Sequence, residues 1–240
     1  MKAKFIIITF IAVPLFSFSQ MNSTIDIIAG VDYSYRSLKL TSDATIPIDI
    51  IGLRNSREIG KFNWRFGFNY NKKLSNKFFL KTGIRLAISG IKGEKQTDLR
   101  WPSEISSSGY EYDPSLPHEL QLIHNYWFLE IPLAVRYEFT DKKFAPFIEA
   151  GISPSYYLTT KTTQINEFET TTITQRAEAN QFVNLHLVGV ISFGANYAIN
   201  EKMQLFGQAV YRRHLTKRVD ALISEYLYNY GIEFGARRRI

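Results

Sequence analysis

Apolar and polar residues alternate one by one in several segments of this chain. In the clearest segment, residues 126–139, Leu129 and Ile131 alternate with Glu130 and Pro132. Successive side chains of a β-strand point to opposite faces, so a period of two predicts a strand with one apolar and one polar face. Eight such segments predict an all-β chain: residues 25–36, 63–71, 78–89, 126–139, 146–158, 183–197, 203–215 and 226–235.

The links between these segments alternate between short and long. Short polar links lie at residues 75–77, 140–143 and 200–202, and long links lie at 37–61, 90–124, 159–181 and 216–225. Transmembrane β-barrels are built with short periplasmic turns at one rim and longer extracellular loops at the other. The alternation therefore predicts a membrane barrel with both termini at the short-turn side.

Charged residues occur near the middle of the predicted polar faces. A closed barrel would gather them in its lumen, where opposite charges can pair, and closure would satisfy every backbone group. We expect an eight-stranded antiparallel transmembrane β-barrel, an up-and-down meander that is narrow enough for side chains to fill. A soluble lipocalin-like barrel, with its apolar faces inward, is the alternative. The predicted lumen ion-pair network comprises Arg65, Arg85, Glu130, Arg136, Glu149, Arg212 and Glu233.

The first residues resemble an export signal. Lys2 and Lys4 precede a mainly apolar stretch, residues 5–16, and the small residues Ser17 and Ser19 follow it. This order is typical of a signal peptide, and the stretch is shorter than the roughly 20 residues of a spanning helix, although a retained anchor is the alternative. We expect Sec export, cleavage of residues 1–19, and a mature β-barrel domain, residues 20–240, in the outer membrane of a Gram-negative bacterium.

The composition of the chain limits the classes of partner that the protein is expected to bind. The net charge of +7 falls to +5 once Lys2 and Lys4 leave, and the basic residues are dispersed. An exported protein seldom meets nucleic acid, so we expect no nucleic-acid partner, and the positive charge instead favours anionic lipopolysaccharide. The absence of cysteine excludes disulfides and a lipoprotein anchor. An aromatic share of 15% suits the aromatic girdles of a membrane barrel.

Two adjoining segments carry a family resemblance. The matching residues of the first are Leu129, Glu130, Ile131, Pro132 and Leu133, and those of the second are Pro146, Phe147, Ile148, Ala150 and Gly151. This pair resembles the PorT-like group of outer-membrane β-barrel proteins, and the layout from signal to last strand is similar to that group. The resemblance implies a barrel of the OmpA and OmpX type. The namesake of the group takes part in type IX protein secretion, so a secretion-associated role is one expectation.

Two constellations could carry chemistry. His214 and Thr216 loosely resemble the His-x-Ser arrangement of lipid A deacylases, with Glu225 as an orienting acid, but alternation places His214 on the lumen face. Glu130 with Glu138 could form an acid/base pair around Arg136. Their spacing of two and six residues equally predicts a simple ladder of lumen ion pairs, which we favour.

The sequence thus predicts a non-enzymatic outer-membrane barrel with a structural, adhesive or secretion-associated role. Its expected partners are outer-membrane lipid, lipopolysaccharide, and another envelope or secretion protein bound through the long loops. The link 90–124 carries Trp101, Tyr110 and Tyr112, which could anchor a partner, although a mobile surface loop is the alternative that we favour. A lipid A modifying enzyme and a small channel are the alternatives. We expect no cofactor and no metal, because the four histidines lack ligand spacing.

Overall fold

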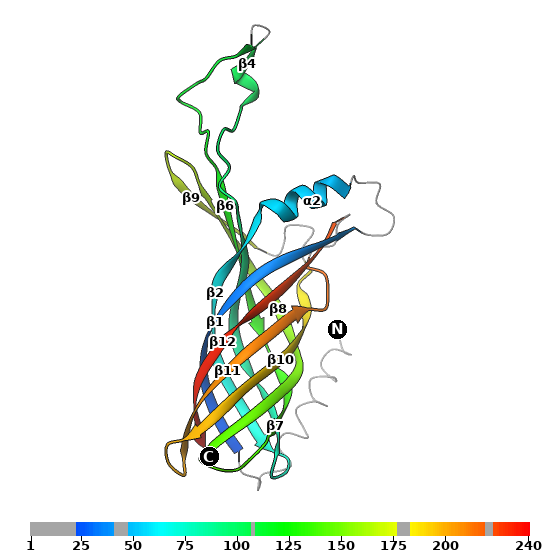
Figure 1. The fold of residues 1–240 in the computed structure, drawn as a ribbon, viewed down its shortest axis with the longest axis vertical. Coiled ribbons are helices and arrows are strands. Elements are labelled where there is room, and N and C mark those ends of the chain that lie inside the picture. The colour runs from blue at the N-terminus through cyan, green and yellow to red at the C-terminus, as the bar shows by residue number, and fades with distance from the viewer. Residues whose placement is uncertain (1–22, 41–47, 107–108, 177–182, 219–222) are drawn as a thin grey trace.

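The computed structural model describes residues 23–40, 48–106, 109–176, 183–218 and 223–240. The predicted signal segment 1–19 and its cleavage point lie outside the described residues. Figure 1 shows a tall barrel of tilted strands, with short turns at the bottom and a long hairpin that projects from the top. Among the residues described, no helix is both long and apolar enough to cross a membrane.

Strands dominate the described chain, and every pairing between them is antiparallel. The barrel strands are β1 (Ser23–Leu40), β2 (Glu58–Lys73), β3 (Phe78–Gly93), β6 (Gln121–Glu130), β7 (Leu133–Glu138), β8 (Phe144–Ile165), β10 (Leu185–Ala198), β11 (Met203–His214) and β12 (Ile223–Arg239). The other elements are α2 (Ile48–Arg57), η1 (Pro102–Glu104), β4 (Ile105–Ser106), β5 (Gly109–Tyr110) and β9 (Thr170–Arg176).

The sheet closes because β1 pairs with both β2 and β12. Tyr33 of β1 is opposite Phe62 on one side and opposite Tyr230 on the other. The remaining neighbours follow chain order, from β2 to β3 and onward to β11 and β12. Closure gives each spanning strand of the ring a neighbour on both sides, so the backbone groups of these strands are satisfied within the ring.

The segments β6 and β7 form one barrel strand with a break. Both pair with β3 on one side and β8 on the other, and only Ile131 and Pro132 separate them. Proline has no N–H to offer a ladder, while the Ile131 N–H donates to the Pro154 carbonyl at 2.9 Å. Counted in this way, the described residues form a ring of eight strands, and the predicted fold class is confirmed.

The two faces of each strand have opposite surroundings. On β2, Trp64 and Phe68 are 65% and 60% exposed, whereas Arg65 and Asn69 are buried. A soluble protein would turn these aromatic side chains inward, since their transfer from water is favourable. The apolar side is therefore the outer surface of the barrel, and the lipocalin-like alternative, with its apolar faces inward, is wrong.

Several links predicted as loops contain regular structure. Strands β3, β6 and β8 continue beyond the apolar belt, β9 pairs with the end of β8, and α2 lies within the link 37–61. The hairpin of β8 and β9 is rich in threonine. Alternation could not reveal it because neither face meets lipid or a core, so no apolar face marks the strand.

Candidate functional site

A cluster of arginines and carboxylates lies in the middle of the lumen. The Nη1 atom of Arg65 lies 2.6 Å from Oδ2 of Asp32, and Nη1 of Arg212 lies 2.9 Å from Oδ1 of the same aspartate. Arg212 also pairs with Glu233, which accepts a hydrogen bond of 2.5 Å from Gln208. Arg65 thus joins the neighbouring strands β2 and β1, and Arg212 joins β11 to β12 and β1.

Two further members complete this central cluster. Glu130 lies 3.5 Å from Arg65, and Arg85 lies 3.6 Å from Glu233. Three arginines therefore face three carboxylates, and all six side chains are almost fully buried. Balanced charge is what a narrow lumen requires, because an unpaired buried charge is very costly. The central cluster comprises Asp32, Arg65, Arg85, Glu130, Arg212 and Glu233.

A second group of charges lies nearer the short turns. Glu149 on β8 pairs with Lys81, and its Oε2 atom lies 3.1 Å from Nη2 of Arg136. Arg237 on β12 donates to Asp26 at 2.7 Å and lies 3.4 Å from Glu138. The network residues predicted from the sequence are therefore all buried in the lumen, but they belong to two groups.

A mostly apolar layer lies above the central cluster. Phe128, Tyr157 and Leu227 are almost fully buried and belong to one contact cluster. The ring of Phe128 lies 5.5 Å from that of His186 and 5.4 Å from that of His214. The lumen is thus filled by aromatic and histidine side chains as well as by ion pairs.

The proposed catalytic residues are not arranged for catalysis. His214 is buried beside Phe128, while Thr216 accepts a hydrogen bond from the Leu187 N–H. Glu225 pairs with arginines, and the described residues include no hydrogen bond that links it to His214.

Glu130 and Glu138, the carboxylates on either side of Arg136, do not form an acid/base pair. Glu130 pairs with Arg65, Arg136 pairs with Glu149, and Glu138 accepts a hydrogen bond of 2.7 Å from Asn196. One strand face presents all three side chains, yet each finds a different partner. This is the arrangement of structural ion pairs.

The long-loop mouth carries its own paired charges. Arg36 pairs with Glu58 and lies 2.8 Å from Glu225, which also pairs with Arg54 and Arg218. An open cavity of about 330 Å³ lies between these arginines and the β8–β9 hairpin. Carboxylates thus already accompany the arginines that face this cavity.

Above the mouth, residues 94–106 and 109–120 form a folded arm (Figure 1). At its centre is Glu104, whose carboxylate accepts hydrogen bonds of 2.9 Å from the N–H groups of Trp101 and Asp113 and lies 2.7 Å from Nε2 of His118. Burial tends to raise the pKa of Glu104, but these backbone donors and His118 prevail and lower the pKa to about 2. The carboxylate is therefore ionised in any physiological medium and holds the arm together.

The turn between β8 and β9 supports the arm. The carboxylate of Glu167 accepts hydrogen bonds of 2.6 Å from the His118 N–H and 2.7 Å from the Glu119 N–H. Burial opposes ionisation of Glu167, yet these backbone donors lower its pKa. Since Glu104 and Glu167 both bind His118, the arm and the turn are joined at one residue.

Large apolar side chains of the arm and this turn are exposed. Tyr112 is 62% exposed although it stacks on His118 with 4.3 Å between ring centres. Aromatic side chains held on an ordered scaffold are typical of binding surfaces. The exposed apolar residues are Trp101, Ile105, Tyr110, Tyr112 and Phe168.

Sequence reasoning missed several members of the charge groups. Asp26, Asp32, Lys81 and Arg237 were not among the expected network residues, although the structure places all four in ion pairs. Alternation could have found them. Lys81 lies four residues from Arg85 on one strand face, and the same spacing relates the other three to residues on polar faces.

A closed ring with an apolar outer surface and paired charges inside defines an integral outer-membrane β-barrel protein. The family model of the outer membrane protein beta-barrel domain matches residues 16–218, and the chain belongs to that family. An outer-membrane location follows from this membership. None of the curated proteins compared with the chain matches it.

Solved structures of similar fold come from several bacteria. Neisserial surface protein A is 10% identical, covering 91% of this chain and 97% of its own, with a TM-score of 0.47. The outer membrane protease OmpT of Escherichia coli is 8% identical, with coverage of 93% and 98% and a TM-score of 0.44. OprG of Pseudomonas aeruginosa is 12% identical, with coverage of 90% and 96% and a TM-score of 0.41. At these identities the similarity concerns architecture alone.

Proposed function

We propose that this protein is a non-enzymatic outer-membrane barrel that binds a protein partner at the cell surface through its arm. The observation that carries the proposal is that Glu104 and Glu167 both bind His118. These contacts join the arm to the β8–β9 turn and so hold their exposed aromatic side chains in fixed positions. An ordered binding surface loses less conformational entropy on association. The barrel then serves as the membrane anchor of this arm.

The lumen supports a role without transport or catalysis. Its central cluster and the layer around Phe128 fill the section that a solute would have to cross. His214 lies inside this filling, away from the lipid face where a lipid A substrate would lie. A lipid A modifying activity and a channel are therefore the weaker candidates.

Site-specific photo-crosslinking on intact cells tests the proposal. A photoreactive residue at the exposed position Ser115 is expected to give adducts of one protein mass. The same probe at Tyr230, on the apolar outer face of β12, is the control and should give no protein adduct. Ile105→Ser with Tyr112→Ser should remove the Ser115 adducts while the barrel still migrates as folded. Failure to obtain adducts at Ser115, or adducts that survive this double change, would contradict the proposal.

A separate measurement addresses the enzymatic candidate. Lipid A mass should be the same in cells that carry the native protein, a deletion, or His214→Ala. A mass difference between the native protein and the deletion, abolished again by His214→Ala, would replace the binding role with a lipid A modifying activity.

The PorT-like resemblance favours a particular partner class within this proposal. The matching residues 129–133 include the break at Ile131 and Pro132, which turns one barrel strand into β6 and β7. We infer that the partner belongs to the secretion or envelope machinery. Identification of the crosslinked protein by mass spectrometry tests this: a soluble protein from outside the cell would argue instead for adhesion.

A further inference from the structure

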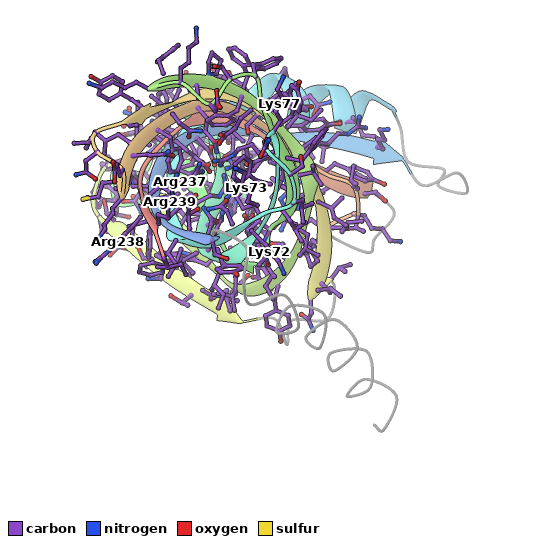
Figure 2. The ribbon with its side chains drawn as sticks, turned by 90° about the horizontal axis from the view of Figure 1, so that it is seen from below. Lys72, Lys73, Lys77, Arg237, Arg238 and Arg239 are labelled. Carbon is purple, nitrogen blue, oxygen red and sulfur yellow. The ribbon has the colours of Figure 1, made fainter. Side chains whose placement is uncertain are left out.

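Positive charge is concentrated at the short-turn rim of the barrel. This rim consists of the links 74–77, 139–143 and 199–202 and the adjoining strand ends. Figure 2 views it from below and places Lys77 and Arg238 on opposite sides of the ring, with Lys73 and Arg239 closer to its centre. We call seven cations of this rim the basic collar: Lys73, Lys77, Lys142, Lys143, Lys202, Arg238 and Arg239.

The collar has little negative charge near it in the sequence. Its three links contain only Asp141 and Glu201 as acidic residues, and Glu138 at the end of β7 lies near Lys73, which leaves seven cations against three carboxylates. Within the described part of the chain, no ion pair involves a collar side chain. At the long-loop mouth, by contrast, Arg36 and Arg218 are paired with carboxylates. The collar cations are thus available to anions from outside the molecule.

Several collar cations lie on the lipid-facing side. The Nζ atom of Lys77 lies 5.9 Å from the ring centre of Tyr137, and that of Lys143 lies 5.1 Å from the ring centre of Tyr197. Both tyrosines belong to the outward faces of their strands. In membrane barrels such aromatic residues form girdles at headgroup level. Lys77 and Lys143 therefore lie where lipid headgroups lie.

Arg238 also lies beside outward-facing apolar side chains, on the other side of the barrel. It is four residues beyond Phe234, whose side chain is 60% exposed on the outer face, and its register partner on β11 is Met203. A shallow depression of about 600 Å³ is lined by Lys202, Met203 and Arg238, together with Asn200 and Glu201. Two cations and an apolar side chain match a phosphate headgroup above its acyl chains.

From these observations we propose that the basic collar binds anionic phospholipid headgroups of the periplasmic leaflet. Short turns of outer-membrane barrels face the periplasm, so the collar meets that leaflet. The cations come from all three links and from the ends of β2 and β12, which suits a shell of lipids around the barrel better than one docked protein. Each Lys or Arg near an anionic lipid surface adds measurably to binding, and the contributions accumulate.

Native mass spectrometry of the full refolded chain in detergent micelles tests the proposal. The probes are phosphatidylglycerol, whose phosphate gives it a net negative charge, and phosphatidylethanolamine, whose ammonium group balances its phosphate. We expect the native protein to retain more phosphatidylglycerol. The collar variant should lose that preference by about tenfold in affinity and leave phosphatidylethanolamine unchanged. The collar variant is Lys77→Gln, Lys143→Gln, Lys202→Gln and Arg238→Gln.

A matched variant removes four cations at the other end of the molecule and should keep the preference. A charge-keeping variant of the collar, with each Lys changed to Arg and Arg238→Lys, should also keep it. Heat-modifiable migration on a gel must show that every variant is folded. The matched variant is Lys39→Gln, Lys95→Gln, Arg100→Gln and Lys161→Gln.

Three results would overturn the proposal: no preference for phosphatidylglycerol in the native protein, an equal loss in both glutamine variants, or displacement of the lipid by inorganic phosphate at the same concentration. The first points to an acidic protein as the partner of the collar. The second indicates unspecific attraction by total charge. The third indicates a site for free phosphate.

Discussion

Arg212 and Asp32 are 180 residues apart in the chain, yet the Nη1 atom of Arg212 lies 2.9 Å from Oδ1 of Asp32. Arg212 belongs to β11 and Asp32 to β1, and β12 lies between these strands in the sheet. The ion pair therefore spans β12 on the lumen side. It ties together the part of the wall where the first and last strands meet.

Removal of this arginine should weaken the barrel strongly. Arg212→Met leaves Asp32 and Glu233 buried with fewer cations, and loss of one partner of a buried ion pair costs about 3–5 kcal/mol. The free energy of unfolding in urea, measured in micelles, should fall by that amount. The neighbouring change Arg213→Met is the matched control, because this side chain points outward and surface changes alter stability by about 0.5 kcal/mol. Equal losses for the two variants would contradict a structural role for the central cluster.

The arm should withstand mild acid and open only in strong acid. Glu104 has a folded pKa of about 2, below the ordinary glutamate value of 4.5. The stabilisation by its ionised form is therefore complete above pH 4.5 and is lost as the pH falls through about 2. Hydrogen exchange of the Asp113 N–H should stay slow at pH 5 and be relatively faster, after correction for intrinsic rates, near pH 2.

Glu104→Gln tests the same contact without a pH change. This variant should show fast exchange of the Asp113 N–H at pH 5, since the charged acceptor is gone. Glu94→Gln, an exposed change elsewhere on the arm, should leave that exchange slow. An arm that opens already at pH 4 to 5 in the native protein would show that Glu104 does not hold it.

Two equally exposed phenylalanines should respond differently to the same substitution, because one lies on the lipid-facing side of the barrel and the other lies in the β8–β9 turn. Phe193 on β10 and Phe168 in the β8–β9 turn are 60% and 59% exposed. Phe193→Arg places a charge on the lipid-facing side of the barrel and should lower stability in lipid vesicles by about 2 kcal/mol. Phe168→Arg should leave stability unchanged because its side chain meets water. If the two variants are equally stable in vesicles, the outer face of β10 is not in lipid.

The filled lumen should not conduct. In planar lipid bilayers the purified protein is expected to give no discrete conductance steps, because the layer of Phe128, Tyr157 and Leu227 and the central cluster both block the axis. A wide outer-membrane porin reconstituted under the same conditions serves as the positive control. Regular single-channel steps from this protein would show that the lumen opens.

The sequence predicts the spanning strands because two environments mark them. Lipid selects apolar residues such as Trp64 and Phe68 on one face, and the lumen selects polar ones such as Arg65 on the other, so a period of two results. Where both environments end, the pattern ends as well. The arm with Glu104 and the helix α2 therefore could not be placed from alternation.

The sequence predicts which charged side chains point into the lumen, but it does not predict which of them pair with one another. Alternation turns Glu130 and Arg136 to the same face, but the stagger between strands decides that one meets Arg65 and the other Glu149. This stagger depends on how the whole sheet closes. It is a property of the ring, and no local segment of sequence contains it.

The pairing of β1 with β12 also sets the order of assembly. Thr24 is opposite Arg239, so the earliest described strand gains its second neighbour only from the final one. Every other pair of neighbouring barrel strands consists of strands that follow one another along the chain. Until the last strand arrives, β1 has an open edge, and folding must bridge nearly the full length of the polypeptide, which makes it slow. The interval before this pairing forms is the period in which the nascent protein most needs protection against aggregation.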